Sequence, residues 1–323
     1  MRSDLLMLIS LMALAASMGW PALAGAEGSP SSRIVVTLGT ATPGGGFPLY
    51  GDAFAAAIED TDPGLHIETR NTKGSTENIP LLEAGKLDLA LVQGEAAFEA
   101  LHGIGRPPAD LRILSAMYAT AGMFVVRGDS PYRSIGDLKG KPVAFGARGS
   151  GLVILSRYVL DGVGLAQDKD FQAIYLERAG DGPAMVLDGR AAALWGGGVG
   201  WPGFETMAKQ GGRFIAPSAE EIQRILAKHP FLKPVTLPAN SYPGQGAAIP
   251  SVGSWSFVLA RPSLPDDVAY RVARAIHRGE ANLARRLPQA RESTMSNTVA
   301  AAPRVDLLHP GVQRYLKEQG LLK

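Results

Sequence analysis

Histidine and cysteine supply many of the nucleophiles, general bases and metal ligands of enzymes, so their spacing limits the chemistry of this chain. The chain has no cysteine, which excludes disulfide bonds, a thiol nucleophile and every thiolate metal site. No two histidines have the close spacing of a metal-binding helix; they are His66, His102, His229, His277 and His309. No Gly-x-Ser-x-Gly elbow occurs, and no Gly-Lys pair is followed by the serine or threonine of a P-loop. We therefore expect no catalytic residues, no metal ion and no cofactor.

One segment formally matches the Gly-x-Gly-x-x-Gly fingerprint of dinucleotide-binding proteins. It runs from Gly198 to Gly203 and follows a predicted strand. However, the bulky Trp201 and the rigid Pro202 occupy positions where the backbone must approach a pyrophosphate closely. We favour a glycine-rich loop of a ligand cleft over a nucleotide site.

Four polar or glycine-rich loops indicate a different chemistry, because each lies between the carboxyl end of a predicted strand and the start of a predicted helix. They span residues 40–47, 72–78, 93–95 and 146–151. Ligands of open α/β sheets bind at this edge, and helix N-termini there present free N–H groups and a positive dipole end, which favour an anion. A ligand that touches all four loops would bridge two lobes. The alternative is that Ser75 only caps its helix and that the glycines only allow tight turns.

The elements that must position these loops follow from the hydrophobic pattern. Strands alternate with helices from Arg33 onward, which is typical of parallel βαβ units and predicts open α/β sheets. Strands are expected over residues 34–38, 65–69, 87–92, 111–118, 123–127, 143–145, 171–176, 191–195 and 255–260. Helices are expected over residues 49–58, 75–84, 95–101, 151–163 and 183–187, with a long one starting near Pro265. The segment 230–250 is rich in Pro and Gly and is expected to be irregular.

A chain of this length suits two domains better than one. We expect lobe I to comprise residues 27–127 and 251–323, and lobe II to comprise residues 128–250. The formal net charge is only +2, and the near balance of acids and bases gives no electrostatic footprint for nucleic acid. A nucleic-acid partner is therefore not expected.

The N-terminal residues 1–26 have the pattern of a secretory signal peptide. Arg2 precedes an apolar stretch that begins at Leu5, and small residues around Ala24 and Ala26 mark possible cleavage sites. The stretch is shorter than the roughly 18 to 20 residues that span a bilayer. The absence of cysteine also removes the anchor point of bacterial lipoproteins. We expect a protein released into the periplasm after cleavage near Ala24 or Ala26.

At the four loops the sequence resembles the TAXI-type extracytoplasmic solute receptors of tripartite ATP-independent periplasmic (TRAP) transporters. The matching segments are residues 39–40 and 44–47, 73–79, 81–93, 135–141, 149–151 and 309–315. They extend over nearly the whole chain in the order expected for this family. The resemblance is therefore specific.

This resemblance implies a type II periplasmic-binding fold, in which two α/β lobes are joined by crossing hinge strands and close on a ligand in the cleft between them. It implies no catalysis, a small carboxylate ligand such as glutamate or 2-oxoglutarate, and delivery to integral-membrane transporter subunits driven by an ion gradient. The alternative is a receptor of an ATP-driven (ABC) importer or of a sensor kinase with the same fold. An enzyme is a third reading, since pyrimidine-synthesis proteins of the thiamine pathway resemble this fold. Those proteins rely on His and Cys clusters, which this chain lacks.

The chain departs from the family pattern near the expected site. Phe47 replaces the usual Tyr, Leu152 the usual Thr, and Ala192 a common Asp, while the basic residue Arg148 is unusual beside the Gly-Ser-Gly turn. Two hydroxyls and a carboxylate are therefore missing. We infer that the ligand is less polar than glutamate.

We expect Arg148 and the N–H groups of Ser150 and Gly151 to hold an anionic group, since a planar guanidinium suits a carboxylate. An apolar wall is expected from Phe47, Tyr50 and one of Trp195 and Trp201. The alternatives are a surface role for Arg148 and ordinary core or hinge packing for the two tryptophans. The full set of expected ligand-binding residues is Thr40, Thr42, Phe47, Tyr50, Ser75, Gln93, Arg148, Ser150, Gly151, Trp195 and Trp201.

Overall fold

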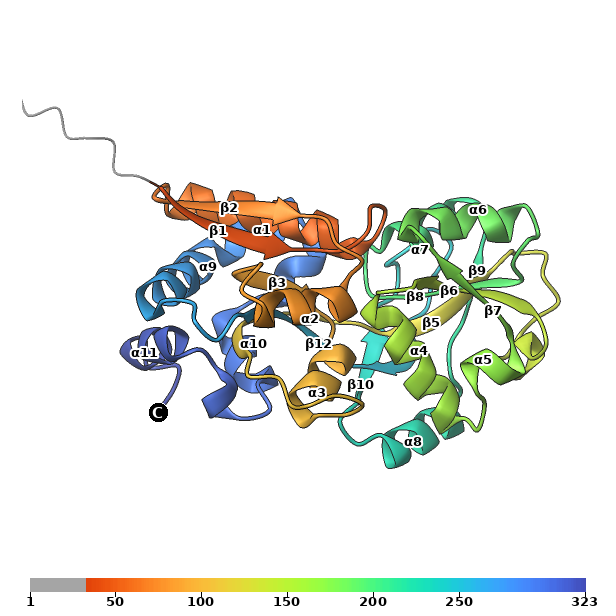
Figure 1. Cartoon of the computed structure of the whole chain (residues 1–323). Helices are drawn as coiled ribbons and strands as arrows, with labels where there is room; N and C mark the ends of the chain where they lie inside the picture. Colours follow the sequence, from red (N-terminus) through yellow and green to blue (C-terminus); the bar gives the residue numbers. More distant parts are fainter. Residues whose placement is uncertain (1–32) are drawn as a thin grey trace, which may run out of the picture. The chain divides into compact units, whose positions relative to one another are not determined.

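The computed structural model describes residues 33–323 (Figure 1). The signal peptide expected over residues 1–26 lies outside the described residues. Among the described helices, none has both the length and the apolar composition that crossing a membrane requires.

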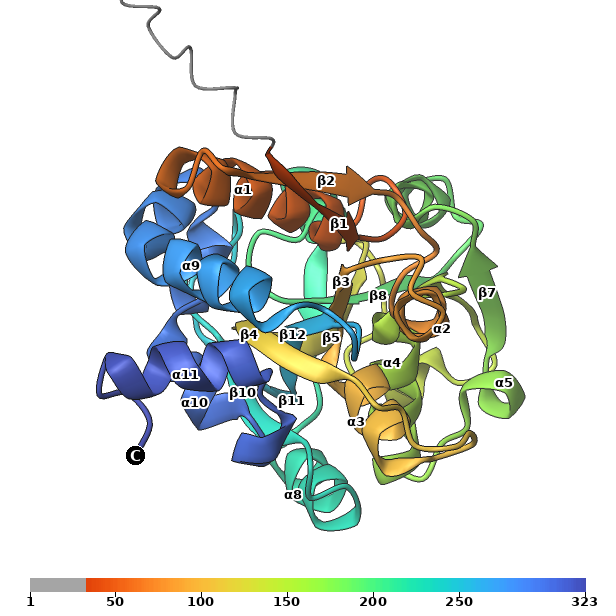
Figure 2. The same ribbon diagram turned by 60° about the vertical axis from the view of Figure 1, so that its left-hand side comes forward.

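Lobe I is built on a mixed five-stranded sheet. In spatial order its strands are β2 (Leu65–Arg70), β1 (Ile34–Gly39), β3 (Leu89–Val92), β12 (Trp255–Ala260) and β4 (Arg112–Ala119). Strand β1 is parallel to β2 and β3, whereas β12 runs antiparallel to β3 and β4. The helices of this lobe are α1 (Gly46–Thr61), α2 (Ser75–Glu83), α3 (Gly94–His102), α9 (Asp266–Arg286), α10 (Met295–Ala301) and α11 (Pro310–Glu318). Figure 2 shows α9 beside α1, with α11 next to it.

Lobe II repeats this plan with a second mixed sheet. In spatial order its strands are β7 (Gln172–Leu176), β6 (Pro142–Ala147), β8 (Ala193–Gly197), β5 (Gly122–Val126) and β9 (Arg213–Ile215). Strand β6 is parallel to β7 and β8, and β5 runs antiparallel to β8 and β9. The helices are α4 (Gly151–Gly162), α5 (Gln167–Asp170), α6 (Gly182–Leu187), α7 (Pro202–Lys209) and α8 (Ala219–Lys228). The predicted pair of α/β lobes is confirmed.

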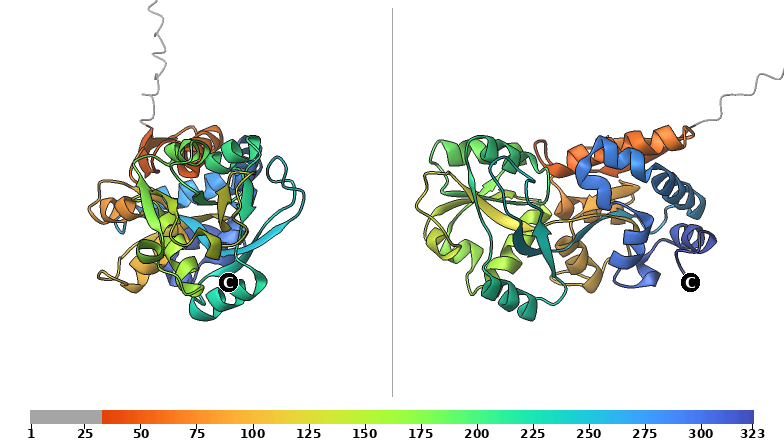
Figure 3. Two further views of the ribbon diagram at one scale, coloured as in Figure 1. Left: turned by 90° about the vertical axis from the view of Figure 1, so that its right-hand side faces the viewer. Right: turned by 180° about the vertical axis from the view of Figure 1, so that it is seen from behind.

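Helices cover both faces of the lobe II sheet (Figure 3). Its central strands are therefore buried on both sides and separate two apolar clusters. In β8, Trp195 packs with Phe124 of β5 in one cluster, while the adjacent Leu194 packs with Met123 in the other. This follows from the alternation of side chains along a strand.

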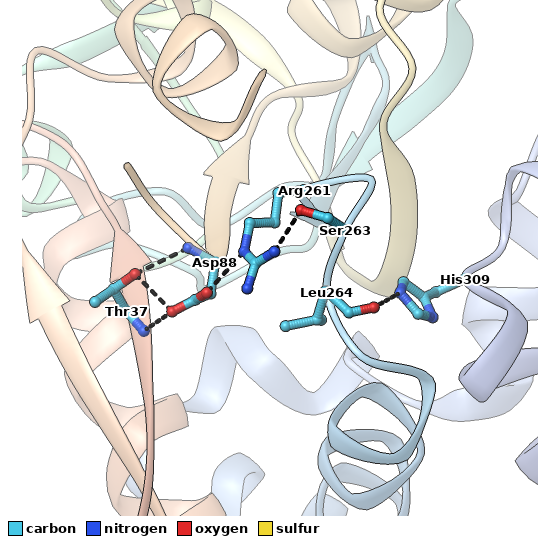
Figure 4. Close-up of polar contacts among 6 residues, drawn as sticks. All are labelled: Thr37, Asp88, Arg261, Ser263, Leu264 and His309. Carbon is cyan, nitrogen blue, oxygen red and sulfur yellow. Dashed lines mark hydrogen bonds and ion pairs between the residues drawn. The ribbon is translucent and has the colours of Figure 1, made fainter. Parts of the chain in front are cut away.

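A polar network at the start of β3 links three strands of lobe I (Figure 4). The Asp88 carboxylate accepts hydrogen bonds from the backbone N–H and the hydroxyl of Thr37, both at 2.9 Å, and from Nε of Arg261 at 2.8 Å. Partial burial tends to raise the pKa of Asp88, but the bonds from Thr37 and the Arg261 guanidinium outweigh it and hold the pKa below its usual range. Asp88 belongs to one of the segments that resemble TAXI receptors, and here its role is to fix the sheet.

Within residues 33–323 the chain crosses between the lobes twice, where β4 leads to β5 and where β11 (Ile249–Gly253) leads to β12. The two crossing segments lie side by side, because the N–H of Thr120 donates to the carbonyl of Ser254 at 3.1 Å. Residues 123–127 were expected in lobe I, but β5 pairs in the lobe II sheet. We propose that the first lobe boundary lies at Thr120 and Ala121, and the second at Gly253 and Ser254.

The composition of segment 230–250 suggested an irregular structure. Part of the segment instead forms a strand. Strand β10 (Lys233–Leu237) pairs antiparallel with β11 in a separate two-stranded sheet. Pro234 and Pro250 lie within these strands and hid them from a pattern analysis, because proline is confined to sheet edges.

Candidate ligand-binding site

A cavity lies at the carboxyl ends of the parallel strands, where loops of both lobes meet. Lobe I and the first crossing segment contribute Ala41, Thr42, Gly45, Gly46, Phe47, Lys73, Gly74, Ser75, Gln93, Tyr118, Thr120 and Gln289. Lobe II contributes Ala147, Ser150, Gly151, Leu152, Ala179, Gly197 and Trp201. The cavity volume is only about 50 Å³, so this arrangement of the loops suits a small ligand.

Five helices begin at this cavity. Their N-cap residues all belong to its lining: Gly45 of α1, Gly74 of α2, Gln93 of α3, Ser150 of α4 and Trp201 of α7. Across the described chain, α4 is the one of these five with a side-chain cap, from Ser150 Oγ to the Leu152 N–H. The first N–H groups of a helix have no partner within it, and its N-terminus carries a partial positive charge. The cavity is therefore rich in donors and electrically suited to an anion.

The side chain of Gln93 places a buried amide next to the lining. This residue is only 4% exposed, and among residues 33–323 its Nε2 has no hydrogen-bond partner. A buried amide without a partner costs about 1 to 3 kcal/mol. Nε2 itself is fully buried, so it lies behind the lining and does not open into the cavity.

An aromatic wall completes the lining with Phe47, Tyr118 and Trp201. Burial raises the pKa of Tyr118, so its hydroxyl stays protonated at any physiological pH and remains a donor. The ring of Tyr50 packs edge-on against Tyr118 from behind, with the ring centres 5.6 Å apart. The wall thus has an apolar surface and one polar tip.

Seven of the residues expected at the site belong to the lining: Thr42, Phe47, Ser75, Gln93, Ser150, Gly151 and Trp201. Thr40 lies behind it, with its hydroxyl 3.2 Å from the carbonyl of Arg70 at the end of β2. Tyr50 is fully buried in the lobe I core and donates to Ser293 Oγ at 3.1 Å. These two residues support the site from within lobe I.

The other two expected residues are also outside the lining. Arg148 is exposed, and its guanidinium carbon lies 4.9 Å from the ring centre of Tyr175. Trp195 is buried in lobe II, where its Nε1 donates to the carbonyl of Leu152 at 2.8 Å. Ala192 precedes β8 at the end opposite to Gly197, so its missing carboxylate has no bearing on the cavity. These placements favour backbone N–H groups over Arg148 as the groups that bind an anion.

Sequence reasoning missed Tyr118, Thr120 and Gln289. Tyr118 and Thr120 lie where β4 ends and the chain crosses to lobe II. Gln289 lies in a short 3-10 helix, Pro288–Glu292, which follows α9. Tyr118 could have been predicted as a site residue, because it lies at the end of a predicted strand in the first half of the chain. No local pattern identifies Gln289, because folding alone brings residues 288–292 to the crossing segment.

The two lobes contact each other directly beside the cavity. The N–H and hydroxyl of Thr76 in α2 donate to the carbonyl of Gly149 at 3.2 and 3.1 Å, and the N–H of Ala179 donates to Thr42 Oγ1 at 3.1 Å. Farther along α3, Glu99 accepts a hydrogen bond from the Tyr158 hydroxyl at 2.8 Å and pairs with Arg157. These contacts hold the lobes closed around the cavity.

The histidines lie elsewhere in the fold. His66 contacts Glu59 and His229 contacts Asp161, each at 2.8 Å, and neither they nor the other three line the cavity. In the part of the chain that the structure describes, no cluster of three or more His, Cys, Asp or Glu is placed to hold a metal ion. The lining therefore offers hydrogen bonds and apolar contact, and no acid–base pair.

Glu95, one residue into α3, is a buried acid under the hinge. It is 0% exposed, and its Oε1 accepts from the hydroxyl of Ser254 at 2.8 Å, whereas Oε2 has no partner among the described residues. Burial raises the pKa of this carboxyl to about 7, and the bond from Ser254 opposes the increase only in part. The folded protein therefore favours the protonated acid.

This raised pKa predicts a pH-dependent stability. The stabilising effect of protonation is complete below the unfolded pKa, about 4.3, and it is lost as the pH rises through about 7. We expect Glu95→Gln, which mimics the protonated acid, to raise the free energy of unfolding by about 3 kcal/mol at pH 8 and by only about 1 kcal/mol at pH 5. Urea denaturation at both pH values measures this. An equal effect of the substitution at the two pH values would contradict it.

Comparison with known proteins gives a family and a fold. A model of the NMT1-like family matches residues 38–320. Among solved structures, MatC from Rhodopseudomonas palustris with bound malate is similar, with 14% identity over 88% of this chain and 98% of MatC and a TM-score of 0.57. A protein from Bordetella bronchiseptica RB50 has 14% identity over 90% of this chain and 99% of its own, with a TM-score of 0.56. A structure described as a periplasmic transporter has 14% identity over 91% and 99%, with a TM-score of 0.55. The expected two-lobed periplasmic-binding fold is confirmed.

Proposed function

Since the chain belongs to the NMT1-like family, we propose that it is a periplasmic solute-binding protein that captures a small organic anion of the carboxylate type. Its two lobes close on the ligand, and the closed form delivers the ligand to the membrane component of a transporter. Contacts that exist only when the lobes are closed drive this shift between open and closed populations. The protein itself catalyses no reaction.

One observation carries the proposal: the N-cap residues of five helices from both lobes line a single cavity. Because the N-termini come from both lobes, an anion reaches all of them only when the lobes are together. A carboxylate ligand is compatible with this fold, since the similar MatC structure contains malate. The lining also lacks, within residues 33–323, the histidines and carboxylates that general acid–base catalysis requires.

We further propose that the membrane component is that of a TRAP transporter. The support is the resemblance of residues 73–79, 81–93 and 309–315 to TAXI receptors. An ABC importer and a sensor kinase are the alternatives. Uptake reconstituted with the membrane component distinguishes them, because a TRAP transporter is driven by an ion gradient and an ABC importer by ATP.

The binding proposal predicts a thermal shift. Residues 27–323 are screened with dicarboxylates, aromatic acids, amino acids and neutral sugars, and a carboxylate is expected to raise the unfolding midpoint. A ligand at about 100 times its dissociation constant adds about 2.7 kcal/mol to the stability of the folded state. The same ligand should have a much smaller effect on Tyr118→Phe, which lacks the hydroxyl donor of the lining. A midpoint raised only by neutral or cationic compounds would contradict the anion, and turnover of any compound would contradict the absence of catalysis.

A further inference from the structure

We infer that the cavity selects a carboxylate without an ammonium group, such as a 2-oxo or 2-hydroxy acid, and rejects the α-amino acid of the same skeleton. This inference rests on the proposed function and specifies its ligand class. Three properties of the lining carry it: its charges, its hydrogen-bonding groups and its apolar wall.

The charges of the lining leave an ammonium group without a partner. Lys73 is the one charged side chain among the described lining residues, and no aspartate or glutamate joins it. The positive ends of five helix dipoles add to the same sign of potential. A buried ammonium needs a carboxylate or several acceptors to replace its hydration. An α-amino acid would gain attraction at its carboxylate and lose more at its ammonium.

The hydrogen-bonding groups show the same bias, because the lining presents donors and few free acceptors. Its donors include the N–H groups of Gly46, Ser75 and Gly151, each the first residue of a helix, and the Tyr118 hydroxyl. Many of its backbone carbonyls already accept bonds within the chain, namely those of Thr42, Gly74, Gln93, Ala147, Ser150 and Trp201. A keto oxygen or a hydroxyl next to the carboxylate accepts from such donors, whereas an ammonium group cannot accept.

The apolar wall defines the rest of the ligand. Phe47, Leu152 and Trp201 face a cavity of about 50 Å³ and supply no polar side-chain group for a second charge, apart from the indole N–H. The ligand is therefore small, with its charge at one end and an apolar body at the other.

Matched pairs of ligands test the inference by calorimetry on residues 27–323. Each pair shares a skeleton and differs at C2: pyruvate with alanine, phenylpyruvate with phenylalanine, and 4-methyl-2-oxopentanoate with leucine. In every pair that binds, the oxo acid is expected to bind at least about tenfold more tightly than the amino acid.

An isosteric variant tests the cause of the selection. Gln289 lies at the edge of the cavity near Gly198, and Gln289→Glu adds the carboxylate that the lining lacks without changing its shape. This variant should bind the oxo acid more weakly and reduce the ratio of the two affinities by about tenfold. An unchanged ratio would show that sterics and not charge set the preference, which would overturn the charge argument.

Failure of the inference and failure of the proposed function give different results. If an amino acid binds as tightly as its oxo acid, and if that binding is lost in Tyr118→Phe, the inference is overturned and the binding function stands. If no member of the three pairs binds at millimolar concentration, the inference is overturned. If, in addition, only neutral or cationic compounds raise the unfolding midpoint, the anion-binding function fails as well.

Discussion

Replacing Gly151 with alanine is expected to weaken ligand binding by about 30-fold or more while leaving the free energy of unfolding unchanged. Gly151 is the first residue of α4 in lobe II, and it faces lobe I across the cavity. A Cβ at this position would overlap the Cβ of Gln93 and lie 2.9 Å from Ser75 Oγ. The closed form must then open by about 1 Å to restore ordinary contact distances, which lengthens the hydrogen bonds that both lobes make to a ligand.

The stability of the unliganded variant should not fall, because alanine is a better helix former than glycine and the lobes are free to separate. Calorimetry with the ligand found by thermal shift measures the affinity, and urea denaturation measures the stability. Gly136→Ala is the matched control in the same lobe, since the nearest heavy atom to its Cβ would be Ser134 Oγ at 3.7 Å. Unchanged affinity in Gly151→Ala would show that binding does not require the lobes to approach as closely as they do here.

Local sequence signals predicted the loops of the site because those signals describe local chemistry. Glycines and polar residues between a strand and a helix mark a helix N-terminus whatever the rest of the chain does. Ser75, Gln93, Ser150 and Gly151 were identified in this way, and all four are in the lining. Residues that support the lining from behind, such as Tyr50, were expected in the lining itself.

The direction of a side chain is harder to predict than the position of its loop. Ala147, the last residue of β6, lines the cavity, and side chains alternate along a strand, so the next residue, Arg148, leans away from it. Trp195 and Gly197 show another limit: both are in β8, but only the last residue of the strand reaches the cavity. Arg148 was expected at the site because of its charge and Trp195 because of its large apolar side chain. The backbone, however, determines where these side chains point.

Sheet membership is a non-local property, and for that reason β5 was assigned to the other lobe. All five residues of β5 are buried, so the strand has no alternation that distinguishes the two sheets. Its partners β8 and β9 come about 70 to 90 residues later in the sequence. The crossing between lobes is thus defined by contacts between Thr120 and Ser254 that no local pattern contains.

This contact between the crossing segments predicts the largest effect on stability, at Gly253. A Cβ at Gly253 would overlap the carbonyl oxygen of Thr120 and lie 2.8 Å from its carbonyl carbon. Both atoms belong to the backbone and cannot move aside as a side chain does, which is the usual reason for a glycine within a strand. We expect Gly253→Ala to lower the free energy of unfolding by about 3 kcal/mol or more.

Urea denaturation of Gly253→Ala and of a control, Gly246→Ala, measures this effect. In the described chain a Cβ at Gly246 would have no heavy atom within 4 Å, so the control should stay within about 0.5 kcal/mol of the parent protein. Equal stability of the two variants would mean that the crossing segments are not held together. Lobe closure could not then pivot on this contact, because a hinge needs two strands that keep their distance while the lobes around them move.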